Sequence, residues 1–151
     1  MISERLKELG IELPAVAAPV ASYVPAVQAG NQVWTSGQLP FKNGQLLASG
    51  KVGAEVTPEA AEELARTATL NALAAIDAVV GIDNVTRVLK VVGFVASAEG
   101  FGGQPGVVNG ASNLLGEIFG EAGRHARSAV GVYELPLGAP VEIEIVVEIA
   151  G

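Results

Sequence analysis

Arg127 is the residue whose setting in the sequence points most directly to chemistry. It stands in residues 126–130, where the chain leaves a loop and enters an apolar strand, so we expect its side chain to start from a partly buried position. A desolvated guanidinium requires an anionic partner, because arginine does not neutralise itself. That partner is either one of the protein's own glutamates or the carboxylate of a small ligand, bound through the two-pronged fork of the guanidinium.

An acidic row in the last expected strand, residues 141–149, is the second candidate. Glu142, Glu144 and Glu148 alternate with apolar residues and therefore share one face of the strand. A carboxylate beside a substrate can activate water, although most rows of this kind are solvated surface. The alternation gives no reason to prefer one of the three glutamates.

His125 is the only histidine, and the chain has no cysteine. A Ser-His-Asp triad or a histidine-rich metal site would depend on this one residue, so we expect neither. The lack of thiols excludes disulfides, a thiolate nucleophile and thiolate metal sites. Arg124 and Arg127 disfavour a cationic imidazole nearby, and we interpret His125 as a loop residue at a surface or an interface.

A glycine-rich run, residues 100–105, lies between an expected strand and an expected helix, where a dinucleotide-binding fingerprint would occur. The pattern fails because Pro105 replaces the third glycine, and no acidic residue about twenty positions further on is placed to bind a ribose. A flexible connection is the favoured interpretation, with an anion site at the start of the helix as the alternative.

The periodicity of apolar residues predicts the elements that must position these side chains. Thr57 and Pro58 form a helix start with a capping side chain and a proline in the first turn, and Gly81 is placed to end that helix. The strand over residues 87–97 is apolar on both faces, which predicts an interior strand covered on both sides. We expect helices over residues 3–9, 58–80 and 105–119, and strands over residues 23–28, 32–36, 45–48, 87–97, 128–134 and 141–149. This order predicts an α+β domain with two helices on one face of the sheet.

The composition predicts a single domain, residues 1–151, that associates with copies of itself. Half of the residues are apolar and 17% are charged, below the roughly 25% of an ordinary soluble domain. A closed homo-oligomer would cover the surplus apolar surface. The charge-free residues 13–41 contain four prolines and several polar side chains, which indicates strands and turns rather than a membrane span. The four prolines are Pro14, Pro19, Pro25 and Pro40.

The charge and the N-terminus narrow the class of partner and the compartment. A formal net charge of −7 argues against nucleic acid, because binding phosphates needs clustered basic residues. The first ten residues carry both signs of charge and lack the apolar segment of a signal peptide, so the cytoplasm is the expected location.

Three stretches together resemble the Rid family of reactive-intermediate deaminases, also called YjgF-type proteins and often labelled endoribonuclease L-PSP. They are residues 22–25 leading into Thr-Ser-Gly-Gln-Leu-Pro at 35–40, Val-Asn-Gly at 108–110, and ARSAVGVYELP at 126–136 followed by VEIEI at 141–145. The similarity extends from about Ala18 to Ile149. The longer loop near residue 100 and a helical extension, residues 1–17, look like the longer-chain branch of the family.

The resemblance implies a chorismate-mutase-like α+β fold with a mixed sheet, assembled as a homotrimer with sites in the clefts between subunits. By residue-by-residue match, Arg127 would bind a substrate carboxylate and Glu142 would lie near the imine and a water molecule. Two departures occur: Ala129 stands where a cysteine is common, and His125 where a proline is common. Because a pocket thiol is lost, we expect that the preferred substrate size has changed. The remaining positions that would line the cleft are Tyr23, Ser36, Gly37, Asn109 and Ala129.

The implied activity is hydrolysis of 2-imino or enamine acids to 2-keto acids and ammonia, a hydrolase role in metabolite damage control of the 2-iminobutanoate/2-iminopropanoate deaminase type. No metal or organic cofactor is needed, since a protonated imine is already electrophilic. One alternative is a trimer that binds a 2-keto or 2-imino acid without turnover. Another is the endoribonuclease or translation-inhibitor activity attached to some members, against which the acidic composition argues.

Overall fold

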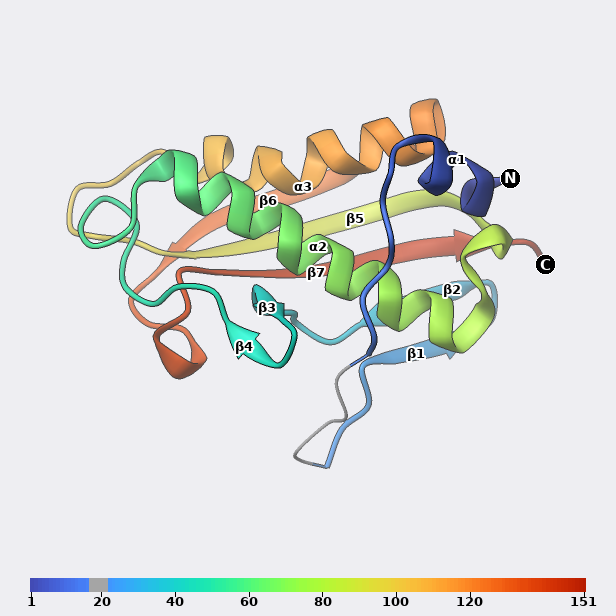
Figure 1. Ribbon diagram of the computed structural model, residues 1–151, viewed down its shortest axis with the longest axis horizontal. Coiled ribbons are helices and arrows are strands. Elements are labelled where there is room, and N and C mark those ends of the chain that lie inside the picture. The colour runs from blue at the N-terminus through green and yellow to red at the C-terminus, as the bar shows by residue number, and fades with distance from the viewer. Residues whose placement is uncertain (17–21) are drawn as a thin grey trace.

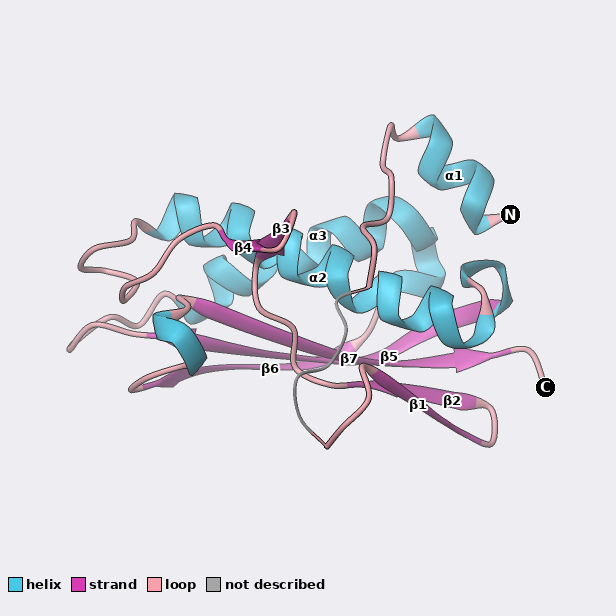
Figure 2. Ribbon diagram, turned by 60° about the horizontal axis from the view of Figure 1, so that its bottom comes forward, coloured by secondary structure: helices cyan, strands magenta, loops and turns pink. Residues whose placement is uncertain are grey.

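The computed structural model describes residues 1–16 and 22–151, and its helices are layered on one face of a sheet (Figure 1; Figure 2). The boundary expected between residues 17 and 18, and Pro19, lie outside the described residues. The elements in chain order are α1 (Ile2–Glu8), β1 (Ala26–Ala29), β2 (Gln32–Thr35), β3 (Phe41–Lys42), β4 (Gln45–Leu46), α2 (Pro58–Val80), the 3-10 turn η1 (Ile82–Asn84), β5 (Val85–Ala96), α3 (Gln104–Phe119), η2 (Gly120–Gly123), β6 (Ala126–Val132), η3 (Pro136–Gly138) and β7 (Val141–Ile149).

The main sheet has the strand order β1-β2-β7-β5-β6, and only the β5–β6 pair is parallel. The predicted α+β class with a mixed sheet is confirmed, as is the interior position of β5. Its cover on both faces is not found, because α2 and α3 lie on one side of the sheet (Figure 2). Val92 and Phe94 point to the other side and remain half-buried. β5 therefore has apolar residues on both faces, although the helices of this chain cover only one of them.

Local signals set the ends of the long helix α2 as predicted. The Thr57 hydroxyl accepts a hydrogen bond from the Ala60 amide at 3.1 Å, and Gly81 ends the helix with a φ of 81°. Strand β6 departs from expectation, because it begins at Ala126 and ends at Val132, two residues before the range expected. Ala126 and Arg127 pair in parallel with Lys90 and Val91, and such pairing cannot be read from side-chain alternation. Arg127 consequently lies within the strand.

Helices α2 and α3 approach each other through Gly110 of α3. A Cβ atom at residue 110 would collide with the backbone carbonyl of Glu62 in α2, so only glycine permits this distance between the helices. Gly93 of β5 likewise allows α3 to lie close to the sheet, since a Cβ there would overlap the Val108 side chain. Close contact at these two glycines fixes the height of α3 over the sheet.

Two glycines of α3 should therefore respond in opposite directions to alanine. Gly110→Ala forces α2 and α3 apart, and we expect it to lower the free energy of unfolding by about 1–3 kcal/mol or more. At Gly116 a Cβ would meet nothing within 4 Å, so Gly116→Ala should stabilise by roughly 0.5–1 kcal/mol through helix propensity. Urea unfolding of both variants measures the difference, and equal effects would contradict this account of the packing.

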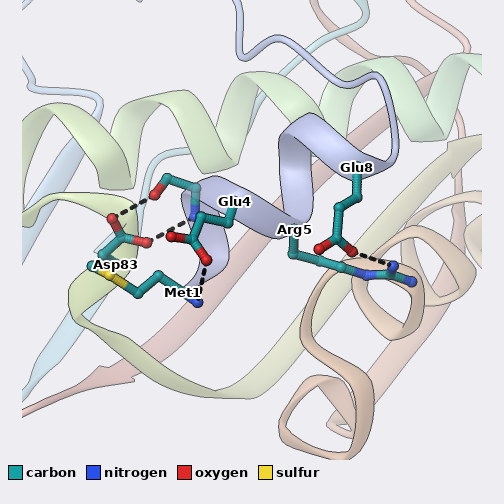
Figure 3. A network of polar contacts seen from close by, with 6 residues as sticks. Met1, Glu4, Arg5, Glu8 and Asp83 are labelled. Carbon is teal, nitrogen blue, oxygen red and sulfur yellow. Dashed lines mark hydrogen bonds and ion pairs between the residues drawn. The ribbon is translucent and has the colours of Figure 1, made fainter.

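Helix α1 is anchored by a residue far away in the sequence (Figure 3). The Ser3 amide and hydroxyl each donate to a carboxylate oxygen of Asp83 in η1, both at 2.7 Å, and Arg5 Nε donates to the Glu117 carbonyl of α3 at 3.0 Å. The hydrogen bonds from Ser3, first from its amide and then from its hydroxyl, lower the pKa of the Asp83 carboxyl. Asp83 thus serves as a cap on α1 from another element.

Loss of the Asp83 charge should release α1. Because its pKa is lowered in the folded state, the contribution of Asp83 is present at neutral pH and is lost as the pH falls through that lowered pKa. Asp83→Asn should speed amide hydrogen exchange in residues 2–8 at neutral pH, with no change in α2. Glu99→Gln removes the same charge from an exposed loop position and serves as the control. Equal exchange rates in both variants would show that Asp83 does not hold the helix.

Candidate active site

Arg127 leaves β6 on the helix-covered side of the sheet and lies against α3. Its Nη1 donates to Asn109 Oδ1 at 2.9 Å and to Ser112 Oγ at 3.1 Å, and its Nη2 donates to the Pro105 carbonyl at 3.3 Å. A guanidinium has five N–H donors. These contacts account for three, and the two others, on Nε and Nη2, share one edge of the guanidinium. That edge has the spacing for a two-point bond to a carboxylate.

The three partners of Arg127 are an amide, a hydroxyl and a carbonyl, and none carries a charge. Among residues 1–16 and 22–151, the side-chain ion pairs use Arg5, Lys51, Arg66 and Arg124. Of the two partners considered from sequence, a glutamate of the same chain is therefore not the one found in the described part of the protein. A half-buried guanidinium without a counter-ion favours an anionic ligand.

Ser112 and His125 are functional candidates that the sequence analysis missed. Ser112 Oγ lies 2.9 Å from His125 Nε2, and His125 Nδ1 lies 2.6 Å from the Gly123 carbonyl oxygen. His125 lies in a loop, as predicted, and it lines a hollow on the surface; the sequence did not predict its link to Arg127 through Ser112. The only available signal was the helical spacing of Asn109 and Ser112, which places both on one face of α3.

Glu142 lies on the opposite face of the sheet, beside Gly37. Its neighbours Val141 and Ile143 are fully buried under the helices, so strand alternation turns Glu142 to the open side. A Cβ at residue 37 would lie 2.7 Å from Cδ of Glu142, so any larger residue there would require the carboxylate to shift. Burial, and secondly the charge of Glu144, raise the pKa of the Glu142 carboxyl. The structure thus singles out one of the three glutamates that the alternation left equivalent.

Ser36 directly precedes Gly37, and hydrogen bonds connect it to the segment that follows Tyr23. The Ser36 hydroxyl donates to the Val24 carbonyl at 2.6 Å, and its amide donates to the Pro25 carbonyl at 2.8 Å. These bonds tie the segment after Tyr23 to the end of β2. The Tyr23 side chain itself is 53% exposed, so it is available to a partner or a ligand.

Within one chain the predicted site residues form two separate groups. The arginine group consists of Arg127, Asn109 and Ala129, and the glutamate group consists of Glu142, Gly37, Ser36 and Tyr23. Arg127 is level with Val91 and Ile145 across the sheet, whereas Glu142 is three residues further along β7. Strand spacing and rise then place the Cα atoms of Arg127 and Glu142 on the order of 14 Å apart. Because their side chains also leave opposite faces, one chain does not bring them to one substrate.

Two hollows lie on the described surface. One, of about 360 Å³, adjoins the arginine group and includes Asn109, Ser112, His125 and Arg127 in its lining. The other, of about 420 Å³, lies on the open face of the sheet beside Trp34, Val92 and Glu144 and contains none of the predicted site residues. The chemistry of the side chains therefore favours the smaller hollow as the ligand-binding one.

Comparisons with known proteins agree with this fold and these motifs. Residues 3–149 match the sequence model of the family described as "YjgF/chorismate mutase-like, putative endoribonuclease". The chain belongs to the YjgF family. Its fold is accordingly the chorismate-mutase-like α+β fold, with a mixed sheet and helices on one face.

Several relatives resemble this YjgF-family chain over nearly its whole length. Protein TCP17 of Trypanosoma cruzi is 43% identical over 150 residues, covering 98% of this chain and 94% of that protein. The crystal structure of Atu1372 from Agrobacterium tumefaciens, described as of unknown function, superposes with a TM-score of 0.91 at 44% identity and covers 99% of this chain and 92% of that one. A structure from Shewanella oneidensis, named "putative endoribonuclease", gives a TM-score of 0.93 at 35% identity and covers 99% of both chains.

Over the residues that the structure describes, none of the helices combines the length and the apolar character needed to cross a bilayer. The interpretation of the charge-free residues 13–41 as strands and turns agrees with β1 and β2, which fall in their described part.

The raised pKa of Glu142 should fall when its acidic neighbour is neutralised. Glu144→Gln removes the repulsion that disfavours the charged form, so the Glu142 carboxyl should titrate at lower pH while remaining above the ordinary range because of burial. Carbon-detected NMR titration of the labelled side chain measures this. Glu148→Gln, further along the same face, is the control, and an equal shift in both variants would remove Glu144 as the local cause.

Proposed function

We propose that this protein hydrolyses reactive 2-imino acids to 2-keto acids and ammonia. The observation that carries the proposal is the Arg127 guanidinium, which neutral oxygen atoms hold in place without a carboxylate from the described chain. A small 2-imino acid supplies the missing carboxylate and presents its imine carbon beside it. Six site positions match the deaminating members that this sequence resembles, and this match supports the same substrate class. They are Tyr23, Ser36, Gly37, Asn109, Arg127 and Glu142.

The site is proposed to form between two copies of the chain in a homotrimer. The arginine group and the glutamate group lie on opposite faces of one sheet, so a substrate that touches both must lie between the arginine group of one copy and the glutamate group of the next. The open sheet face, with Trp34 and Val27 each more than half exposed, supplies apolar surface for such an association. The apolar composition supports oligomerisation independently.

In the proposed reaction, water adds to the carbon of the protonated imine. Arg127 orients the carboxylate, and the backbone around Gly37 and Ala129 lines the imine. Glu142 accepts a proton from the attacking water as the C–O bond forms and the C=N electron pair moves to nitrogen, and it then gives this proton to the amino nitrogen. The hydroxyl group next returns a proton to Glu142 as the C=O bond forms and the C–N bond breaks, so that ammonia leaves. Proton transfer by a positioned group contributes on the order of a hundredfold to ten-thousandfold.

A raised Glu142 pKa suits this double role, because a group that both accepts and donates a proton works best with a pKa near the working pH. The departure at Ala129 affects substrate choice rather than the reaction. Alanine at this position removes a thiol from the pocket wall, and we expect larger substrate side chains to be accepted. The negative charge of the whole protein provides no long-range attraction for an anionic substrate, so Arg127 must act locally.

Removal of Arg127 is the direct test. Imino acids of several side-chain sizes are generated in situ by an amino-acid oxidase, and ammonia release is followed. Arg127→Ala should lose about 1.5–3 kcal/mol of carboxylate binding, which is roughly a ten- to hundredfold fall in kcat/KM. Glu142→Gln should bind 2-oxobutanoate but not accelerate turnover. Arg66→Ala, which removes an arginine that pairs with Glu117 and does not line the hollow at Arg127, serves as the control.

The outcome separates the alternatives. If wild type does not exceed the spontaneous rate with any imine but binds 2-oxobutanoate through Arg127, the protein is a binding trimer without turnover. An endoribonuclease role, the name printed for the Shewanella oneidensis relative, would require RNA binding that survives moderate salt, which the acidic composition does not favour.

A further inference from the structure

A chain of hydrogen bonds runs from Arg127 to the backbone at Gly123. Arg127 Nη1 contacts Ser112 Oγ at 3.1 Å, Ser112 Oγ contacts His125 Nε2 at 2.9 Å, and His125 Nδ1 contacts the Gly123 carbonyl at 2.6 Å. Its members come from β6, α3 and the segment that links η2 to β6. The backbone at Gly123 lies close against α3, since a Cβ there would collide with the Leu115 carbonyl.

The groups at the two ends of this series of hydrogen bonds determine which atom donates in each bond. Arg127 can only donate, and the Gly123 carbonyl can only accept. His125 must therefore carry a proton on Nδ1, and in the neutral imidazole Nε2 is then an acceptor. The Ser112 hydroxyl then donates to Nε2 and accepts from Nη1. Donation to the imidazole polarises the hydroxyl oxygen and makes it a better acceptor for the guanidinium.

We propose that Ser112 and His125 are positioning residues that fix the orientation of the Arg127 guanidinium for its carboxylate ligand. The inference rests on the proposed function, in which Arg127 binds the substrate carboxylate. Asn109 and Ser112 together occupy both hydrogens of Nη1, so the guanidinium cannot turn about its Nε–Cζ bond without breaking one of them. The edge formed by Nε and Nη2 is thereby held ready for a two-point bond.

His125 stands at one of the two positions where this sequence departs from the pattern of the deaminases that it resembles. A proline, common at this position in proteins that this sequence resembles, has no side-chain donor or acceptor and could not link Ser112 to Gly123. The departure is therefore not a neutral surface change.

The tautomer of His125 tests the relay without any ligand. His125 is the only histidine, so its ring nitrogens give an unambiguous long-range ¹H–¹⁵N NMR pattern. Wild type should show the neutral tautomer protonated on Nδ1. Ser112→Ala should weaken that preference and should speed rotation of the Arg127 guanidinium about Nε–Cζ, measured on the same ¹⁵N-labelled protein. An Nε2-protonated ring in wild type, or unchanged rotation in Ser112→Ala, would overturn the inference.

Ligand affinity and kinetics then test the consequence. Each of Ser112→Ala and His125→Leu removes the relay bond, and we expect each to raise the Kd for 2-oxobutanoate and the KM for imines about two- to tenfold, with kcat much less affected. The double variant should cost no more than Ser112→Ala alone, because His125 acts on Arg127 only through Ser112. His125→Gln, which retains an acceptor for Ser112, should recover part of the affinity. Asn113→Ala, an exposed neighbour on α3, is the control.

The two proposals fail in different ways. If wild type neither binds 2-oxobutanoate nor hydrolyses imines, the proposed function fails, and the NMR measurements still decide whether the relay holds Arg127. If wild type is active but Ser112→Ala and His125→Leu match Asn113→Ala, or if their effects add, the positioning role is wrong and the proposed function stands. A purely structural role predicts lower stability with no recovery in His125→Gln.

Discussion

A guanidinium held only by neutral oxygen atoms is the constraint on which the rest of the candidate site depends. Arg127 cannot shed its charge, and the described chain offers it an amide, a hydroxyl and a carbonyl rather than a carboxylate. Such an arrangement keeps the cation in place while leaving its charge uncompensated. A ligand carboxylate would complete it, and this requirement selects small organic acids from the many ligands that a cleft of this size could accept.

Helix α3 carries three of the groups that hold Arg127, so its placement decides the geometry of the arginine group. Gly110 allows α3 to meet α2, and Gly93 allows it to lie low over β5. Gly110 lies on another side of α3 from Ser112, whereas Val108, which meets Gly93, is one helical turn before Ser112 and shares its face. Close packing of α3 on α2 and on β5 thus fixes the side chains that contact the guanidinium.

The same sheet separates what the proposed chemistry must combine. Strand alternation sends Glu142 to the open face, while Arg127 and Ala129 share the helix-covered face of β6. A site built from more than one copy of the chain would bury the open face of the sheet. Such burial would explain why that face is apolar and why the chain has few charged residues. The resemblance predicted sites between subunits, and the geometry of one chain supplies a physical argument for them.

The sequence by itself determined the α+β class, the extents of α2 and β7, and Arg127 as the central candidate. These depend on short-range rules: capping at Thr57, alternation in β7, and the permanent charge of arginine. Only the tertiary structure decided the cover of β5, the early start of β6, the place of Glu142 beside Gly37 and the link from His125 to Arg127. Each of these depends on which distant residues meet: helices against one face of β5, the parallel pairing of β6 with β5, the approach of Gly37 to β7, and a turn that returns His125 to α3. Such contacts between distant residues cannot be predicted from the spacing of residue types in a single sequence.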